Sequence, residues 1–128
     1  MTRLISSGSP LEQELGYSRA VVAGGFVFVS GSSGLVRSPD GTAAGTAAEQ
    51  FAVATGKIAA ALAEADCTLA DVVSTRVYLV DDDDWAAVGR AHGDVFGSTR
   101  PACTMVRVAR LIDPRMRVEV EATALLRA

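Results

Sequence analysis

The chain has 128 residues, of which 49% are hydrophobic and 21% charged. This composition excludes a disordered chain and predicts a single domain over residues 1–128, large enough to bury a core without a disulfide or structural metal. The formal net charge of −3 offers no basic surplus, so we expect no nucleic acid among its partners. Two distant cysteines and one histidine make no zinc motif, and we expect no metal and no cofactor.

No apolar run approaches the ~18 residues of a membrane span, and the first residues lack the apolar core of a signal peptide. We therefore expect no membrane partner and a cytoplasmic location. A reducing compartment also agrees with Cys67 and Cys103, which are too far apart in sequence to form a redox pair of the C-x-x-C type.

The N-terminal part of the chain predicts two short strands. Glycines and a proline interrupt residues 1–16, which we expect to be irregular. Residues 18–22 and 26–30 have strand character, and Gly24-Gly25 between them predicts a tight turn, because glycine accepts positive φ. The nearly continuous apolar residues of 26–30 favour burial on both faces of the sheet.

A loop over residues 31–45 separates these strands from a helix over residues 46–65. The loop is rich in Ser, Gly, Pro and Asp, which are typical turn residues. The helix shows one apolar stripe at helical spacing, formed by Phe51, Ala54, Ile58, Ala61, Leu62 and Ala65.

The second half predicts a strand over residues 72–80, a helix over 84–96 and strands over 104–109 and 116–125. The acidic run at residues 81–84 suits the start of the helix, where backbone amides are unpaired. The apolar stripe of this helix consists of Trp85, Val88, His92 and Val95.

The predicted order is therefore β-β-α-β-α-β-β. Helices that return to the same sheet after a hairpin predict an α/β (α+β) domain, with one mixed sheet and both helices on one face.

Alternation along the last two strands predicts sheet faces of different character. In the last strand one face is apolar, and the other carries Arg117, Glu119, Glu121, Thr123 and Leu125. In the preceding strand the residues Val106 and Val108 share one face, opposite Met105, Arg107 and Ala109. The mixed face either meets solvent or meets other copies of the chain, with Arg107, Arg117 and the two glutamates as an interface network.

Common catalytic and nucleotide-binding motifs are absent, among them G-x-G-x-x-G, the P-loop, H-E-x-x-H and G-x-S-x-G. His92 suits a packed, structural role better than that of a general base. Residues 81–84 suit a solvated helix start better than a cation site, and Cys67 is structural. Cys103 has three open interpretations: a residue lining a pocket, simple packing, or a nucleophile that has no evident base.

In combination, several segments resemble the RidA/YjgF reactive-intermediate deaminase (Rid) family from Gly16 to Leu125. The segments, each weak alone, occur in the family's order and spacing. They are Gly16-Tyr-Ser-Arg-Ala-Val21, Val27-Phe-Val-Ser-Gly31, Ala63-Glu-Ala-Asp-Cys-Thr-Leu-Ala-Asp-Val72, Val77-Tyr-Leu-Val80, Arg100-Pro-Ala-Cys-Thr-Met-Val-Arg-Val-Ala-Arg-Leu111 and Val118-Glu-Val-Glu-Ala122.

This resemblance implies a chorismate-mutase-like homotrimer, with a central barrel of three sheets and small-molecule clefts between neighbouring copies. It also implies hydrolysis of 2-imino acids to 2-oxo acids and ammonia. In active family members an arginine binds the substrate carboxylate, and a glutamate and backbone groups place the attacking water.

By the same resemblance, Glu119 is the candidate catalytic residue, and the candidate substrate-binding residues lie in two stretches of the chain. These residues are Tyr17, Ser30, Gly31, Gly89, Arg100, Cys103 and Thr104. Two positions depart from the family pattern, since Cys103 replaces the carboxylate-binding arginine and Gly89 replaces a cleft asparagine. Arg100 or Arg107 is a possible substitute, although Arg107 is expected on the face opposite Thr104.

The chain therefore resembles an arginine-lacking branch of the family. The first hypothesis is a trimer that binds, and can hydrolyse, a small reactive imine or enamine that is less acidic than an imino acid. The second is a non-catalytic metabolite-binding or regulatory module. An endoribonuclease activity, which has been attached to the family, is disfavoured by the acidic balance and the few aromatic residues.

Overall fold

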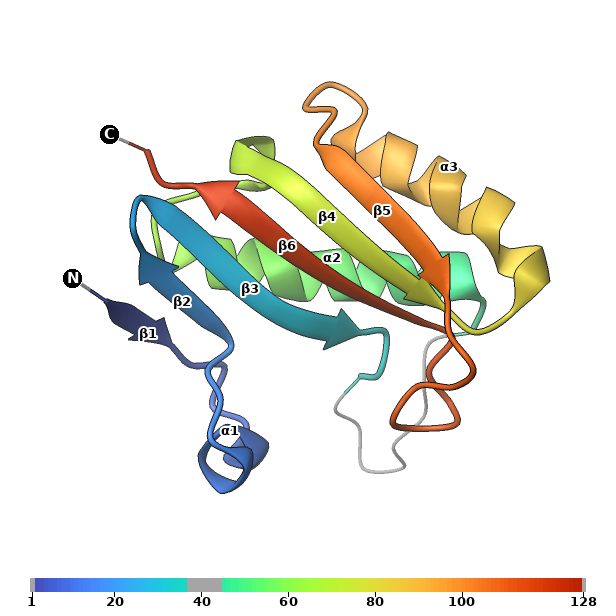
Figure 1. Ribbon diagram of the computed structural model, residues 1–128, viewed down its shortest axis with the longest axis horizontal. Helices are drawn as coiled ribbons and strands as arrows, with labels where there is room; N and C mark the ends of the chain where they lie inside the picture. The colour runs from blue at the N-terminus through green and yellow to red at the C-terminus, as the bar shows by residue number, and fades with distance from the viewer. Residues whose placement is uncertain (1, 37–44, 128) are drawn as a thin grey trace.

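A computed structural model describes residues 2–36 and 45–127, and within these residues six strands form one mixed sheet (Figure 1). Only β4 and β5 pair in parallel among these strands. The order across the sheet is β1 (Arg3–Ile5), β2 (Ala20–Ala23), β3 (Phe26–Ser33), β6 (Val118–Leu125), β4 (Val72–Leu79) and β5 (Ala102–Arg107).

The helices α2 (Ala47–Ala63) and α3 (Trp85–Phe96) lie on the same face of this sheet, and the strands in Figure 1 lie in front of α2. The predicted fold class is therefore confirmed, together with the order of the elements that the prediction contained. None of the helices in the described part of the chain has the length and hydropathy to cross a membrane.

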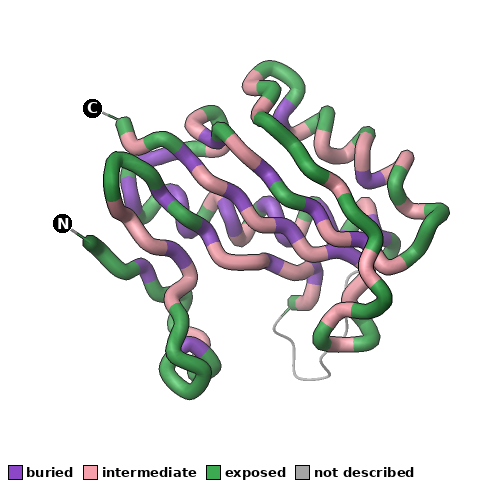
Figure 2. Tube along the Cα trace, viewed as in Figure 1, coloured by how far each residue is buried: buried purple, intermediate pink, exposed green. Residues whose placement is uncertain are grey.

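The core lies between the sheet and α2, as the alternation of buried residues along the strands shows in Figure 2. Thr46 caps α2 and exchanges hydrogen bonds with Glu49, which explains why the helix begins there. The stripe expected to pack is buried throughout, and Phe51, Ile58 and Leu62 are fully inaccessible. The predicted helix over residues 46–65 is confirmed.

The expectation of an irregular N-terminus is wrong, because this segment forms β1 and the short helix α1 (Pro10–Leu15). Ser9 caps α1 through the amide of Leu11, and Gly16 ends it at a φ of 74°. Ser9 before Pro10 is a signal for a helix start, and Gly16 is a signal for a helix end. The residues that interrupt the pattern therefore mark the two ends of a helix.

The turn at Gly24-Gly25 is confirmed, with φ values of 59° and 84°. The strand after it, β3, runs beyond residue 30 through a register shift between Val29 and Ser32. Burial on both faces is not found in the single chain, since Phe26 and Phe28 are 38% and 48% exposed. Part of the predicted loop, residues 37–44, lies outside the described residues.

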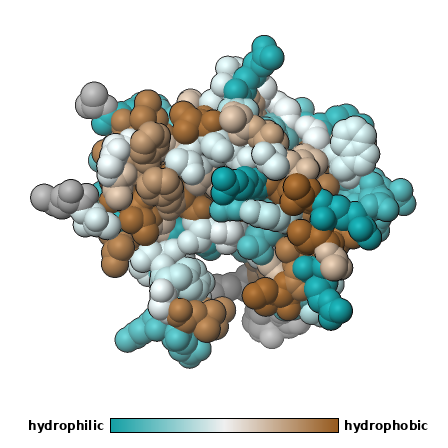
Figure 3. All heavy atoms as spheres, in the orientation of Figure 1, coloured by the Kyte–Doolittle hydropathy of each residue, from teal (hydrophilic) through white to brown (hydrophobic). Residues whose placement is uncertain are grey.

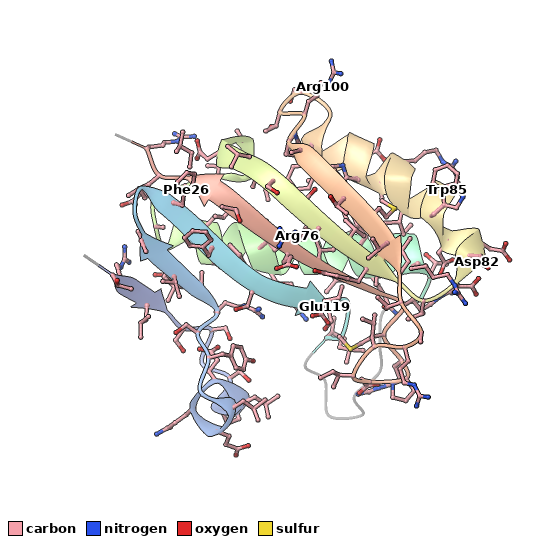
Figure 4. All side chains as sticks on the ribbon, viewed as in Figure 1. Phe26, Arg76, Asp82, Trp85, Arg100 and Glu119 are labelled. Atoms are coloured by element: carbon pink, nitrogen blue, oxygen red, sulfur yellow. The ribbon has the colours of Figure 1, made fainter. Side chains whose placement is uncertain are left out.

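The helix predicted over residues 84–96 is confirmed as α3, preceded by a 3-10 turn (Asp82–Asp84). Its predicted stripe is correct at Val88, which is fully buried, and wrong at Trp85, which is 66% exposed. Trp85 is the first residue of the helix, and its side chain lies at the end of α3, away from the sheet, in Figure 4.

The faces of β5 are the reverse of those predicted. Met105 lies beside the buried Val77 and packs on the core, whereas Val106 lies beside Tyr78 on the open face, the sheet face opposite α2 and α3. Side chains of paired residues share a face, and the edge position of β5 lets Arg107 leave the helix-side face for solvent. Val108 and Ala109 lie beyond the end of the strand.

The network of Arg107, Arg117 and the two glutamates, one of the two alternatives for the mixed face, does not form within the single chain, where Arg107 lies on the helix-side face. Arg107 pairs with Asp82 at 2.7 Å and Arg117 with Asp84 at 2.9 Å, both at the start of α3. The arginine that shares the open face with Glu121 is Arg76, its register partner on β4.

Candidate functional site

Gly31 and Glu119, two residues expected at the site, are in close contact on neighbouring strands. Gly31 lies within the register shift of β3, beside β6. A Cβ atom at Gly31 would lie 2.2 Å from Oε1 of Glu119, so a larger residue there requires this carboxylate to move from its present position. The fit explains why a glycine stands here at a backbone conformation that any residue can adopt.

Ser30 and Tyr17 lie close to this pair in the fold. The Ser30 hydroxyl donates to the Ser18 carbonyl at 2.7 Å, which ties β3 to the segment before β2. Tyr17 follows α1, donates its amide to the Glu12 carbonyl at 2.9 Å and leaves 39% of its surface exposed. The Ser30–Ser18 bond thus brings the segment that contains Tyr17 next to the half of β3 that carries Ser30 and Gly31, where Gly31 contacts Glu119.

A shallow hollow of about 250 Å³ opens beside Glu119, and its lining residues come from β3, β4, β6 and the loop after β5. They are Gly31, Tyr78, Leu111, Glu119 and Glu121. Figure 3 looks onto this open face, which is hollowed between α1 and the loop of residues 108–117. The Tyr78 hydroxyl donates to Glu121, and this bond raises the pKa of Tyr78. The hollow thus presents two carboxyl groups and a phenol.

Two cations beside Glu119 were not expected from the sequence. Arg19 donates to the Gly31 carbonyl at 2.7 Å, and Lys57 of α2 donates to the Leu35 carbonyl at 2.6 Å. Burial raises the pKa of Glu119, whereas the charges of Arg19 and Lys57 oppose that rise. Lys57 lies outside every segment that carries the family resemblance, and Arg19 lies within one of them, residues 16–21, without being an expected site residue. The packing of α2 under β3 brings Lys57 to the strand that Arg19 also contacts.

Cys103 and Thr104, expected to line one pocket together, point to opposite faces of β5. Cys103 is paired with the buried Thr75 and shares the helix-side face, while Thr104 is paired with Arg76 on the open face. The Cys103 thiol is exposed, and Cys67 is buried as expected. The expectation that Arg107 faces away from Thr104 is confirmed by the same register.

His92 lies on α3 and contacts Thr75, the register partner of Cys103. Its Nε2 atom is 2.9 Å from the Thr75 hydroxyl, and its ring contacts those of Phe51 and Phe96 at centroid distances of 5.9 and 4.7 Å. Burial lowers the pKa of His92. These contacts support the structural role expected for this histidine.

Gly89 and Arg100, the remaining two expected residues, also belong to the β5 side of the molecule. A Cβ atom at Gly89 would meet no atom within 4 Å, so the helix surface there is open. Arg100 has a φ of 51° in the loop before β5, and its side chain points away from the sheet in Figure 4. Arg100 therefore does not take the place of the missing arginine within its own chain.

The expected residues thus form two groups that one chain does not bring together. The strands β6 and β4 separate β3 from β5, which places Gly31 and Cys103 on strands about 14 Å apart. In addition, Glu119 points to the open face and Cys103 to the helix-side face. In Figure 4 Glu119 and Arg100 accordingly lie at different ends of the sheet.

The acidic run at residues 81–84 serves the fold. Asp81 accepts from the amide of Asp83, while Asp82 and Asp84 pair with arginines. Within residues 2–36 and 45–127, no three His, Cys, Asp or Glu side chains gather as metal ligands would.

Comparisons with known proteins agree with the resemblance seen in the sequence. The family model described as "Endoribonuclease L-PSP" matches residues 8–126. An uncharacterized protein of Streptomyces coelicolor is 40% identical over 122 residues, covering 95% of this chain and 90% of the relative. The human 2-iminobutanoate/2-iminopropanoate deaminase is 33% identical over 110 residues, covering 85% of this chain and 79% of the enzyme.

A solved structure shows the same fold. The crystal structure of a YjgF/YER057c/UK114 family member from Mycobacterium tuberculosis is 42% identical, with a TM-score of 0.86 and coverage of 98% of this chain and 99% of that chain. With a family model matching nearly the whole chain and relatives above 30% identity, the chain belongs to the RidA/YjgF (Endoribonuclease L-PSP) family.

Proposed function

We propose that the chain works as a homotrimer that binds small reactive imines or enamines in clefts between neighbouring copies and hydrolyses them. The observation that carries this proposal is the separation of the family-matched residues into two groups. Glu119 and Gly31 lie on the open face at the end of β3, whereas Cys103 lies on the opposite face of the edge strand β5. In our proposal one copy supplies the Glu119 group and a neighbouring copy supplies the Cys103 group of the same cleft.

The open face supports assembly. Large apolar side chains stand on it without cover in the single chain: Phe26, Phe28, Val73, Val106 and Leu125 are 38–51% exposed. In Figure 3 apolar side chains gather over the β2–β3 hairpin, beside a hydrophilic centre. Exposed apolar groups of this extent are typical of surfaces that meet another protein.

In the proposed reaction, the Glu119 carboxylate takes a proton from a water molecule as the water oxygen attacks the imine carbon. The electron pair of the C=N bond moves to nitrogen, which takes up a proton, and a carbinolamine forms. Loss of ammonia from that intermediate, with release of the hydroxyl proton, leaves the carbonyl product. The contact of Glu119 with Gly31 fixes the carboxylate beside the hollow where a ligand would lie.

The ligand we propose lacks a carboxylate at the Cys103 side. A thiol provides neither a permanent charge nor paired donors. Arg107, on the same face, is engaged by Asp82 at 2.7 Å, and Arg100 points away from the sheet. Losing one charged partner of such a contact costs about 2 kcal/mol or more, which is roughly 30-fold in affinity.

Sedimentation and a coupled imine-hydrolysis assay test this proposal. We expect a particle of three chains, weak activity on 2-iminopropanoate, higher activity on an imine without a carboxylate, and a gain on 2-iminopropanoate in Cys103→Arg. Thr104→Arg is the matched control, because it adds the same side chain to the opposite face of β5. Strong wild-type activity on 2-iminopropanoate would contradict the role given to Cys103, and a monomer would contradict the shared cleft.

A non-catalytic binding module is the second candidate. It is favoured by the open surface at Gly89, which offers no side chain to a ligand, together with the absence of a cation at Cys103. Saturable binding of a neutral imine analogue without turnover of any imine or enamine would support it over the enzyme.

Endoribonuclease action, as in the family description, is not our proposal. Four arginines that would serve a phosphate backbone are paired with aspartates instead: Arg107, Arg115, Arg117 and Arg127. Such pairing leaves these side chains little positive field to attract RNA.

A further inference from the structure

Glu119 carries its charge in a half-buried position, which raises the question of what compensates it. Its carboxylate lies over Gly31 and lines the hollow. In the part of the chain that the structure describes, no cation forms a direct ion pair with it. Any compensation therefore comes from charges that are fixed nearby without touching the carboxylate.

Arg19 is one such charge. Its Nη2 atom donates to the Gly31 carbonyl at 2.7 Å, so the guanidinium is held at the same glycine that makes room for Glu119. Its Nε atom is buried and has no hydrogen-bond partner among the described residues. The guanidinium is therefore held in this part of the chain through its bond to the Gly31 carbonyl, with its Nε atom free of any hydrogen bond among the described residues.

Lys57 is the second charge. Its Nζ atom donates to the Leu35 carbonyl at 2.6 Å and lies 3.4 Å from the Ser33 hydroxyl. Ser33 is the register partner of Glu119 on β3, so these contacts fix the ammonium group at the strand position next to the carboxylate. Burial and the neighbouring Arg19 lower the pKa of Lys57, while Glu119 raises it.

We propose that Arg19 and Lys57 are positioning residues for Glu119: together they hold its side chain as a carboxylate anion over Gly31, at the edge of the hollow. The inference rests on the proposed function, in which Glu119 accepts a proton from water. In this inference the positive charges near the hollow stabilise the protein's own Glu119 carboxylate. They are distinct from the arginine that binds the substrate carboxylate in family members, whose position is occupied here by Cys103.

The other charged and titratable groups near Glu119 act in the opposite direction. Glu121, two residues along β6, raises the pKa of Glu119, as burial does. The Tyr78 hydroxyl of β4 donates its hydrogen bond to Glu121, so it does not stabilise the Glu119 anion. Without Arg19 and Lys57, every remaining influence on Glu119 favours the protonated acid, which cannot take a proton from water.

A carboxyl-carbon NMR titration of Glu119 in the assembled protein tests this inference. We expect Arg19→Gln and Lys57→Met to shift its titration to higher pH, and Arg19→Lys, which keeps the charge, to restore it. Where hydrolysis is measurable, the acidic limb of its pH profile shifts with the titration. Arg3→Gln is the matched control, since Arg3 likewise donates to a backbone carbonyl, that of Glu64 at 2.6 Å, yet is absent from the influences on Glu119.

An unshifted titration in Arg19→Gln or Lys57→Met would overturn the role of that residue. If Arg19→Gln does not fold, Lys57→Met and Arg19→Lys still decide, because a charge effect predicts a shift in the first and none in the second. The titration needs no substrate, so it can fail while imine hydrolysis is observed, and it can succeed while no imine is hydrolysed.

Discussion

The two ends of the proposed cleft differ in how much of their structure one chain supplies. At the Glu119 end, a glycine, a carboxylate and two cations are fixed by contacts between β3, β6, α2 and the segment before β2. At the Cys103 end, the thiol is exposed on an edge strand and Gly89 faces open space. One chain therefore fixes the groups at the Glu119 end closely and leaves the Cys103 end open, and in our proposal a neighbouring copy completes that end.

The two glycines at these ends provide the largest contrast. Gly31→Ala puts a methyl group 2.2 Å from the present Oε1 of Glu119 and must displace the carboxylate. We expect hydrolysis to fall by about 100-fold or more, the usual contribution of a general base. Circular dichroism and sedimentation would show whether fold and assembly are retained, so that the loss can be assigned to Glu119.

Gly89→Ala is the control at the other end. Its Cβ atom meets open space within an α-helix, where alanine is favoured over glycine by about 0.5–1 kcal/mol. We expect a melting temperature raised by a few degrees and a loss of hydrolysis well below that of Gly31→Ala, because the added methyl group displaces no catalytic group of its own chain. Equal losses of activity in Gly31→Ala and Gly89→Ala would contradict the proposed difference between the closely packed Glu119 end and the open Cys103 end.

The same contrast separates what the sequence could predict from what it could not. The apolar stripe predicts α2, and the glycine pair predicts the turn at Gly24-Gly25, because both are local signals in the sequence. The resemblance selected Gly31 and Glu119, which the structure brings into contact. Arg19 stands in a segment that matches the family, two residues from Tyr17, so the sequence did offer a signal for it. Lys57 has no such signal, and only the packing of α2 under β3 reveals it.

The β5 side was harder to predict for a different physical reason. An edge strand has neighbours on one side only, so burial no longer distinguishes its two faces, and an alternating sequence gives the wrong assignment for Met105 and Val106. In the N-terminal segment, Ser9-Pro10 and Gly16 begin and end a helix, but the same residue types also interrupt regular structure, so the sequence alone does not distinguish the two.

Stability measurements sharpen the comparison at the Glu119 end. Burial raises the pKa of Glu119 above its ordinary value of 4.5, so the folded protein favours the neutral acid more than the unfolded chain does. Stability from this group is therefore present below pH 4.5 and is lost as the pH rises through the folded pKa. At pH 7 we expect Glu119→Gln to raise the melting temperature by roughly 1–3 °C while hydrolysis is lost.

Glu121→Gln is the matched control on the same strand and face. Its amide oxygen can still accept the Tyr78 hydroxyl, and we expect no comparable rise in melting temperature. A lower melting temperature in Glu119→Gln would mean that Arg19 and Lys57 stabilise the carboxylate by more than its burial costs.

The smallest effect concerns His92, behind the Cys103 end. Because burial lowers its pKa from 6.5, the unfolded chain takes up a proton below pH 6.5 that the folded protein does not bind, and stability falls as the pH drops through that window. We expect urea unfolding to show a loss of less than about 1 kcal/mol between pH 7.5 and 5.5. His92→Gln, which can keep a hydrogen bond to Thr75, should abolish this pH dependence of stability. Cys103→Ser should leave the pH dependence unchanged. A change in Cys103→Ser would show that the thiol and the imidazole act together, and the Cys103 end would then be more than an open surface.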